Sequence, residues 1–245
     1  MQYTYAVITG ASTGIGRAIS LSLAKTGVHI LLIARTKERL EETLDMIQQE
    51  GGNGTIIPTD LSTIESINTC ISTIKKETTI VNILVNVAGI WHGKNEVYAK
   101  RNFETFPQEV ILDTYTVGTI APTLLTHALI PFMPKGGKIL NISGTFESGA
   151  KGWLPYFVSK RAIEDLTIGL AEELKEKDIQ VNAISPSDTA TEAYKKYFPQ
   201  YIKDAIDPSE IATYATYLCS EKAHSITGKV FVMKKGKQPY EGYHT

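Results

Sequence analysis

The stretch Thr9-Gly10-Ala11-Ser12-Thr13-Gly14-Ile15-Gly16 decides the fold of this 245-residue chain. It follows a short apolar run, Tyr5–Thr9, and leads into an amphipathic stretch, Ile15–Lys25. Glycines let a chain turn tightly and bring its backbone N–H groups close to an anion, while a following helix presents its positive N-terminus to the same anion. The order of strand, glycine-rich turn and helix predicts a phosphate-binding unit rather than an ordinary βα turn. No Gly-Lys-Ser/Thr follows, which excludes a Walker-type loop.

Short apolar runs and longer amphipathic stretches alternate along the rest of the chain. Val, Ile and Leu dominate the runs, which is typical of strands buried on both faces of a parallel sheet. We expect a doubly wound (Rossmann) α/β fold, with a mostly parallel seven-stranded sheet in a three-layer α/β/α arrangement and a single domain over residues 1–245. Besides Tyr5–Thr9, the expected strands are His29–Ala34, Thr55–Pro58, Ile83–Val87, Lys138–Ile142, Ile179–Ile184 and Lys229–Met233. Besides Ile15–Lys25, the expected helices are Lys37–Gln49, Thr63–Glu77, Pro107–Phe132, Pro155–Lys177 and Ser209–Ser220.

The composition argues against several classes of function. The formal net charge is -1, so no global basic field exists to attract nucleic acid or an anionic membrane. The chain has two cysteines and no Cys/His cluster with metal-ligand spacing. Its apolar runs are too short to span a bilayer, and no leader-like segment follows Met1. We therefore expect a cytoplasmic protein with no metal, nucleic-acid or membrane partner.

The glycine spacing Gly-x3-Gly-x-Gly resembles that of the short-chain dehydrogenase/reductase family. Two further motifs are similar to the family's: Asn86-Val87-Ala88-Gly89 approaches Asn-Asn-Ala-Gly, and the stretch from Pro186 to Thr191 approaches Pro-Gly-x-Val-x-Thr, with Ser187 in place of the glycine. The resemblance runs from Thr4 to Val232. It implies that a nicotinamide dinucleotide is held by Gly10, Ser12, Thr13, Gly14, Ile15, Gly16, Leu61, Asn86, Ala88, Gly89, Pro186, Thr189 and Thr191.

Two residues concern the adenosine end of such a cofactor. Arg35 follows the second expected strand, where NAD-specific proteins usually place an acid for the ribose 2′-hydroxyl. A guanidinium can bind a 2′-phosphate in bidentate fashion, so we expect NADP(H) to be favoured over NAD(H), unless Arg35 is merely solvated. Asp60 ends the third strand. The resemblance implies that Asp60 accepts a hydrogen bond from adenine, and it can also cap the helix that starts near Ser62 or Thr63.

The strongest catalytic signal is Tyr156-Phe157-Val158-Ser159-Lys160. Positions i and i+4 share one helix face, and the preceding Pro155 is typical of a first helical turn. A nearby ammonium stabilises a phenolate and lowers its pKa from about 10, so Tyr156 can act as general acid toward a carbonyl or general base toward an alcohol. The resemblance implies that Lys160 also binds the nicotinamide ribose, so Tyr156 and Lys160 count among the cofactor contacts.

The residue that holds the substrate oxygen is less sharply marked. In the resembled family it is a serine thirteen residues before the tyrosine, which is Ser143 here, and we expect Ser143 to take this role. The family's Asn-Ile-Ser-Ser becomes Asn-Ile-Ser-Gly, with Gly144 in place of the second serine, so Thr145 is the alternative. The family also has a proton-relaying asparagine on the helix before the fifth strand, and Tyr115 occupies that position.

These residues predict an NADP(H)-dependent oxidoreductase that transfers a hydride between the nicotinamide and a small carbonyl or secondary alcohol. In this mechanism Tyr156 exchanges the proton, Lys160 lowers its pKa and Ser143 holds the oxygen. The alternative is a dinucleotide-binding sensor or scaffold with weak or no catalysis, which Tyr115 and Gly144 keep open.

The sequence does not identify the substrate, although aromatic residues near the expected site suggest an apolar, aromatic or alicyclic ligand. The pocket candidates are Trp91, His92, Trp153, Leu154 and Tyr194–Phe198. Residues 190–207 are expected to form a lid over the substrate. By the resemblance we expect a homodimer or homotetramer built on the two long helices, and we expect the tail Lys234–Thr245 to reach a neighbouring subunit or to fray.

Overall fold

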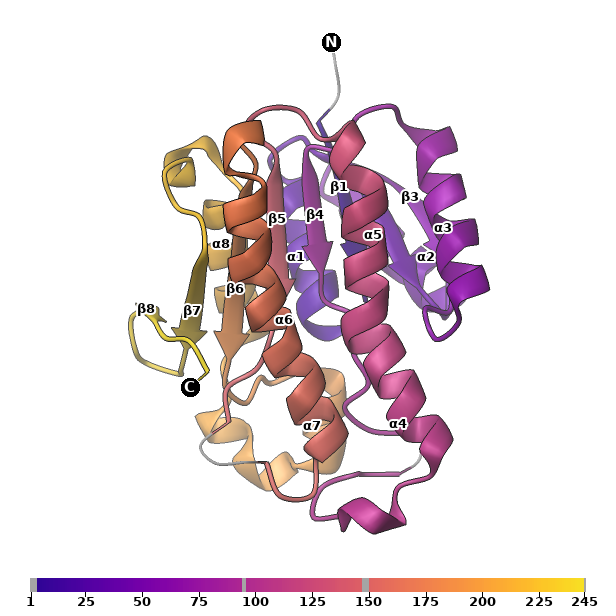
Figure 1. Ribbon diagram of the computed structural model, residues 1–245, viewed down its shortest axis with the longest axis vertical. Coiled ribbons are helices and arrows are strands. Elements are labelled where there is room, and N and C mark those ends of the chain that lie inside the picture. Colours follow the sequence, from indigo (N-terminus) through magenta and orange to yellow (C-terminus); the bar gives the residue numbers. More distant parts are fainter. Residues whose placement is uncertain (1–3, 94–95, 147–149, 245) are drawn as a thin grey trace.

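The computed structural model describes residues 4–93, 96–146 and 150–244 (Figure 1). One eight-stranded sheet runs through it in the order β3-β2-β1-β4-β5-β6-β7-β8. The first seven strands pair in parallel, and β8 pairs antiparallel to β7. The order reverses between β1 and β4, which makes this the topological switch point of the sheet. The strands are β1 (Tyr5–Thr9), β2 (His29–Ala34), β3 (Asn53–Pro58), β4 (Ile83–Asn86), β5 (Lys138–Ile142), β6 (Gln180–Pro186), β7 (Lys229–Met233) and β8 (Tyr240–Glu241).

The eighth strand corrects the expected count of seven. β8 is only two residues long, and its pairs are Phe231 with Glu241 and Val232 with Tyr240. A two-residue strand contains no apolar run and no alternation, so periodicity could not indicate it. The seven longer strands lie where the apolar runs predicted them, with small shifts at their ends.

Helices cover both faces of the sheet, which confirms the three-layer α/β/α arrangement. Helices α1, α2 and α8 pack on one face, while α3, α5 and α6 pack on the other (Figure 1). Helix α7 lies beyond the carboxyl ends of the strands, at the bottom of this view. The α-helices are α1 (Gly14–Ala24), α2 (Lys37–Gln49), α3 (Ile64–Glu77), α4 (Gln108–Tyr115), α5 (Ala121–Leu129), α6 (Leu154–Glu173), α7 (Glu192–Tyr197) and α8 (Pro208–Leu218), with shorter 3₁₀ turns at Phe103–Thr105, Ile130–Phe132, Lys175–Lys177, Pro199–Asp204 and Glu221–Ala223. Within the described ranges, no helix combines the length and apolar character needed to cross a membrane.

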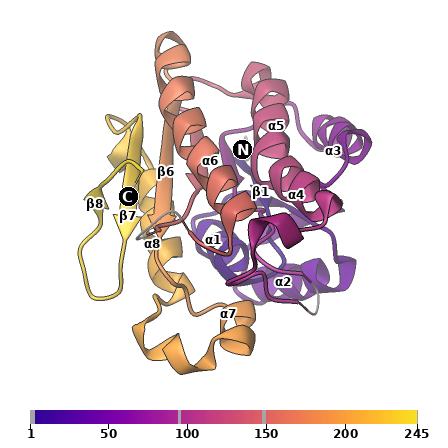
Figure 2. The ribbon, with the colours of Figure 1, turned by 60° about the horizontal axis from the view of Figure 1, so that its bottom comes forward.

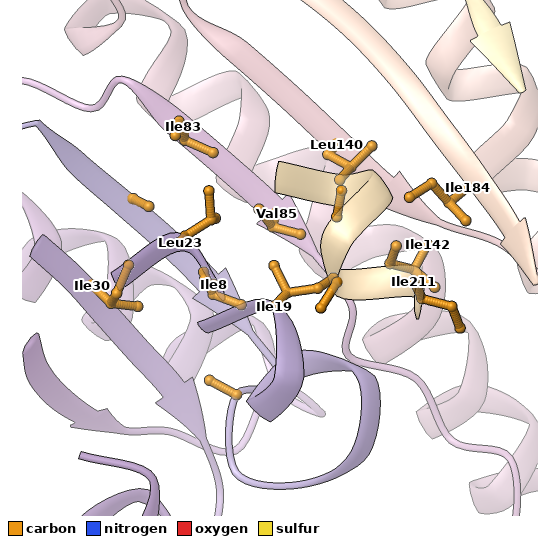
Figure 3. Close-up of a cluster of buried hydrophobic side chains, with 14 of the residues drawn as sticks. Ile8, Ile19, Leu23, Ile30, Ile83, Val85, Leu140, Ile142, Ile184 and Ile211 are labelled. Carbon is orange, nitrogen blue, oxygen red and sulfur yellow. The ribbon is translucent and has the colours of Figure 1, made fainter. Parts of the chain in front are cut away.

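The sheet separates two apolar cores. Ile8, Ile30 and Val85 lie in the core that also contains α1 and α8 side chains (Figure 3), whereas their chain neighbours Val7 and Leu31 lie in the opposite core. Successive residues of a strand point to opposite faces, so a sheet covered on both faces requires apolar residues at nearly every position. This requirement explains why the strands appear in the sequence as continuous apolar runs.

The single helix expected over Pro107–Phe132 is interrupted in the structure. A π turn over Thr116–Ile120 joins α4 to α5. Pro122 lacks the N–H that an α-helix would direct at the carbonyl of Gly118, so the hydrogen-bond ladder widens at this point. Gly118 also packs closely on α6, because a methyl group there would lie 2.9 Å from Ser159 Oγ. The interruption therefore has both a backbone cause and a packing cause.

The described part of the C-terminal tail packs on its own chain, which corrects the expectation that it frays. After β8, the Tyr243 hydroxyl donates a hydrogen bond to the Asp165 carboxylate. The backbone N–H of His244 donates to Glu164 Oε2 at 2.8 Å. These contacts fix the tail to α6. The last expected tail residue, Thr245, lies outside the described residues, as do positions 1–3, 94–95 and 147–149 of the expected domain.

Candidate active site

A cavity of about 530 Å³ opens at the carboxyl ends of the strands, beside the β1–β4 switch point. Figure 2 brings this edge of the sheet forward. Ligands of doubly wound sheets bind at such an edge. The cavity unites all but one of the residues that the sequence predicted for cofactor binding and catalysis: Gly10, Ser12, Thr13, Gly14, Ile15, Gly16, Arg35, Asp60, Leu61, Ala88, Gly89, Ser143, Tyr156, Lys160, Pro186, Thr189 and Thr191.

Asn86 is the exception, because its side chain is buried behind the cavity. Its Nδ2 donates to Asn141 Oδ1 at 2.9 Å, and Asn141 Nδ2 donates in turn to Thr167 Oγ1 at 2.9 Å. This chain of hydrogen bonds joins β4, β5 and α6. Asn86 therefore supports the strand end beneath the cavity instead of lining it.

The glycine-rich turn exposes its backbone to the cavity. Gly10 has a φ of 67°, a conformation that residues with side chains rarely adopt. A methyl group at Gly16 would lie 2.1 Å from the Gly10 carbonyl oxygen, so the turn and α1 can pack this closely only without a side chain. Thr13, at the N-cap of α1, makes no side-chain hydrogen bond to the helix. The first N–H groups of α1 are thus left without a side-chain cap, which suits the binding of a pyrophosphate.

The rim beyond β2 and β3 has the features of an adenosine site. Arg35 and Arg39 are exposed and both line the cavity there, where two guanidinium groups suit an additional phosphate. Asp60 lines the same end. The cap of α3 is Thr63, whose hydroxyl accepts a hydrogen bond from the first turn of that helix at 3.2 Å. Thr63 and not Asp60 is therefore the N-cap of α3, and the Asp60 carboxylate accepts a hydrogen bond from the backbone N–H of Ser62, just before that helix, at 3.0 Å.

Tyr156 and Lys160 lie one turn apart on α6 and both line the cavity, with Pro155 in the first turn. Lys160 Nζ is buried, donates to the Ile142 carbonyl at 2.8 Å and lies 5.5 Å from the centre of the Tyr156 ring. Burial lowers the pKa of Lys160 to about 8 and raises the pKa of Tyr156 above its ordinary value. The lowered Tyr156 pKa that the motif predicts is not found here, because desolvation of the hydroxyl dominates.

Ser143 lines the cavity, but its hydroxyl proton is directed away from it. Ser143 Oγ donates to Glu164 Oε1 at 2.9 Å. Glu164 is fully buried on α6, and its other oxygen accepts from Arg161 at 3.0 Å and from the backbone N–H of His244. A buried carboxylate requires such donors, since an unpaired buried charge is costly. The Ser143 hydroxyl is one of the hydrogen-bond donors that pair with the Glu164 carboxylate.

The neighbouring positions define what else can contact a substrate oxygen. The Thr145 hydroxyl donates to the Ser185 carbonyl at 2.8 Å. Gly144 lies beside Lys160, where a methyl group would stay 3.5 Å or more from every neighbouring atom. Tyr115, which occupies the position of the family's relay asparagine, ends α4 and is not among the described residues that line the cavity.

The end of the cavity near Tyr156 is lined by rings. Of the predicted pocket residues, Trp91, His92, Trp153 and Tyr194 line it, whereas Leu154 and residues 195–198 do not. His92 is held by Nδ1 at 2.7 Å from the Gly93 carbonyl and by ring contact with Tyr197. In the described ranges, no three His, Cys, Asp or Glu side chains form a group that could hold a metal ion.

The segment 190–207 packs against the glycine-rich turn. It contains α7 and the 3₁₀ turn at Pro199–Asp204. A methyl group at Gly14 would lie 2.9 Å from the Thr191 side chain, and Arg17 on α1 pairs with Glu192 at 3.5 Å. In this arrangement the segment covers one side of the cavity.

Sequence reasoning missed three residues that shape the site. The Thr9 hydroxyl accepts hydrogen bonds from the backbone N–H groups of Val87 at 3.0 Å and Ala88 at 3.2 Å, which fixes the loop after β4 against β1. Thr9 could have been found from the sequence, because it is a polar residue at the end of an apolar strand. Glu164 could have been found from its position four residues after Lys160, on the same helix face. Phe146 carried no signal, because it follows a strand with no recognisable pattern.

Comparison with known proteins gives close parallels over nearly the whole chain. The chain is 30% identical over 244 residues to 5-keto-D-gluconate 5-reductase of Escherichia coli strain K12, covering 94% of this chain and 93% of that protein. It is 31% identical over 221 residues to fatty acyl-CoA reductase of Acinetobacter baylyi, covering 89% and 69%. The crystal structure of landomycin C-6 ketoreductase LanV, with bound NADP and rabelomycin, has 26% identity, a TM-score of 0.82 and coverage of 94% of both chains.

The family model described as short chain dehydrogenase matches residues 4–202. This range includes the glycine-rich turn, the Tyr156–Lys160 pair and most of the segment 190–207. The named relatives are reductases, and a similar solved structure contains NADP. The chain is therefore an NAD(P)-dependent oxidoreductase that belongs to the short-chain dehydrogenase/reductase family.

Proposed function

We propose that this enzyme uses NADP(H) to interconvert a small carbonyl compound and the corresponding secondary alcohol, with Tyr156 and Lys160 as its catalytic residues. The observation that carries the proposal is a single cavity with a phosphate-suited helix N-terminus at one end and the Tyr156–Lys160 pair at the other. A dinucleotide bound along it has its reactive ring at the Tyr156 end.

The roles follow from chemistry and position. Bound NADPH would supply a hydride to the carbonyl carbon, so that the addition of one proton at oxygen yields the alcohol and NADP⁺. Tyr156 supplies that proton from its hydroxyl, which burial keeps protonated in the free protein. Lys160, as an ammonium, stabilises the phenolate that remains and so facilitates proton transfer from Tyr156. Its hydrogen bond to the Ile142 carbonyl fixes the ammonium at the wall of the cavity.

For the substrate oxygen we keep Ser143 as the proposed donor and Thr145 as its alternative. Each hydroxyl donates elsewhere in this structure, Ser143 to Glu164 and Thr145 to Ser185. Either one must exchange that hydrogen bond for one to the substrate. Comparing kcat for Ser143→Ala and Thr145→Ala distinguishes them, since only the true donor lowers kcat without changing the NADPH Kd.

A preference for NADP(H) over NAD(H) is the next part of the proposal. It is supported by Arg35 and Arg39 at the adenosine rim, which can neutralise a 2′-phosphate. A second candidate function, a dinucleotide sensor with weak catalysis, is favoured by one observation: the Ser143 hydroxyl already donates to Glu164. Turnover at an ordinary enzymatic rate with any carbonyl substrate would reject the sensor.

We also propose that the chain self-associates as a dimer or tetramer through the face formed by α4, the π turn and α6. Three large apolar side chains stand exposed on these elements: Leu112 (64%), Ile120 (39%) and Val158 (41%). Contiguous exposed apolar surface is typical of association sites, and these three side chains stand on elements that pack against one another. Sedimentation of the wild type and of Leu112→Lys tests this, and a monomeric wild type would contradict it.

The function is tested by adding purified protein to NADPH and a panel of neutral ketones, aldehydes and keto acids, with NADPH absorbance as the readout. We expect saturable binding of NADPH and oxidation with at least one panel class. A protein that binds neither NADPH nor NADH would contradict the proposal.

A further inference from the structure

The wall of the cavity beside Tyr156 is built from aromatic rings of separate segments. Trp91 follows β4, Phe146 follows β5, Trp153 precedes α6 and Tyr194 belongs to α7. Trp91 is stacked on Tyr194 with 6.0 Å between ring centres and 15° between planes. It also lies 6.1 Å from Trp153, and Phe146 lies 6.0 Å edge-on to Tyr156.

These rings hold one another in place. Phe198, behind the wall, contacts Trp91 at 5.5 Å, Tyr194 at 5.5 Å and Trp153 at 6.2 Å. Burial and the neighbouring Asp188 carboxylate both raise the pKa of the Tyr194 hydroxyl. A rigid aromatic surface loses little conformational freedom on binding, so it is suited to a flat apolar partner.

The charges at this end are equally selective. Two acidic residues line the cavity: Asp188, which neighbours Tyr194, and Glu192, which pairs with Arg17 on α1 at 3.5 Å. Among the described lining residues the cations are Arg35 and Arg39, at the adenosine rim, and Lys160, whose ammonium donates to the Ile142 carbonyl. Among the described lining residues near Tyr156, an anionic substrate would thus meet the Asp188 carboxylate and no guanidinium with which to pair.

We propose that the enzyme acts on neutral ring ketones, aromatic or fused alicyclic, and discriminates against keto acids of the sugar series. The inference rests on the proposed function, because it assigns the substrate class of the same site. It separates this chain from the relative named for 5-keto-D-gluconate, whose substrate carries a carboxylate and several hydroxyl groups. Trp91 is the residue assigned to stack on the ring of the substrate, and Tyr194 backs it.

The chain offers a direct probe of this wall. It has two tryptophans, Trp91 and Trp153, and both line the cavity near Tyr156. Intrinsic tryptophan fluorescence therefore reports ring binding there whether or not the ligand is reduced.

The test titrates the NADP⁺-loaded protein with 1-tetralone, a neutral fused-ring ketone, and with 5-keto-D-gluconate, while NADPH oxidation is measured for each in parallel. We expect saturable quenching by 1-tetralone and a kcat/KM at least about tenfold above that for the keto acid. Trp91→Ala should raise the 1-tetralone Kd about tenfold, because both stacking and apolar contact are lost, whereas Trp91→Phe should keep most of the affinity. Tyr217→Ala, at an exposed ring on α8, is the matched control and should change neither value.

The outcomes separate the two proposals. A higher kcat/KM for 5-keto-D-gluconate, or an unchanged 1-tetralone Kd in a Trp91→Ala protein that still binds NADPH, would overturn the ring-ketone assignment and leave the reductase function standing. Saturable quenching by 1-tetralone with no reduction of any carbonyl would overturn the reductase function and support ring recognition. Absence of quenching by 1-tetralone would overturn the assignment directly.

Discussion

The two ends of the cavity are built by different means. At the dinucleotide end the backbone makes the site: a positive φ at Gly10, the contact of Gly16 with Gly10, and a helix N-terminus without a side-chain cap. At the substrate end side chains make it, from the segments after β4, β5 and β6 and from α6. A backbone site tolerates few residue types, so its sequence is recognisable. A side-chain site can be altered residue by residue, and its specificity can change within one fold.

The largest expected effect on cofactor binding comes from placing the same substitution, glycine to alanine, at both ends of the cavity. Gly16→Ala places a methyl group 2.1 Å from the Gly10 carbonyl oxygen and forces the turn apart, whereas Gly144→Ala meets its nearest atom at 3.5 Å. We expect Gly16→Ala to raise the NADPH Kd by about a hundredfold or more, equivalent to ~2.7 kcal/mol. Gly144→Ala should leave it within about twofold. Isothermal titration measures both, and equal effects would remove the contrast between the two ends.

The next effect tests the buried support of the substrate end. Glu164→Gln removes a carboxylate that Arg161, Ser143 and the His244 N–H all contact. Leaving Arg161 without this charge should lower the free energy of unfolding by about 3 kcal/mol. Asp165→Asn, one residue further along and largely exposed, is the control and should cost under about 1 kcal/mol. Urea denaturation gives both values, and a stable Glu164→Gln protein would refute the buried network.

These two regions also show how far sequence reasoning reached. The glycine-rich turn, the seven longer strands and the Tyr156–Lys160 pair could be predicted, because each depends on residues close together in the chain. The hydrogen bond of Ser143 depends on Glu164, 21 positions away, so counting back from Tyr156 could not reveal it. The π turn depends on packing against α6, and β8 depends on pairing with β7, so neither leaves a local pattern.

A smaller effect concerns the cofactor preference. Arg35→Ala removes one cation at the adenosine rim, where Arg39 remains. We expect the Kd of NADPH to rise about tenfold and that of NADH to stay within about twofold, because only NADPH carries the 2′-phosphate. Fluorescence titration of both cofactors against wild type and variant measures the difference. Equal weakening of both would place Arg35 outside the phosphate site.

The most gradual effect is the pH response of Lys160, whose pKa burial lowers to about 8. The ammonium is present below that pH and is lost above it, so kcat/KM for NADPH should fall as pH rises through about 8. The unfolded lysine keeps its proton to higher pH, so the desolvation cost is fully present below pH 8. Stability should therefore rise from pH 8 to 10, by at most about 1.4 kcal/mol per pH unit. The Lys160→Met variant should lose both pH dependences. A pH dependence that persists in this variant would belong to another group.

The central claim is that Tyr156 transfers the proton at the end of a cavity that holds the dinucleotide. The most direct measurement is single-turnover oxidation of bound NADPH by the best ketone of the panel, for wild type and for Tyr156→Phe. The account predicts an unchanged NADPH Kd and a rate lowered by about a hundredfold to ten-thousandfold, the range of general acid catalysis. A Tyr156→Phe protein that oxidises NADPH at the wild-type rate would contradict it.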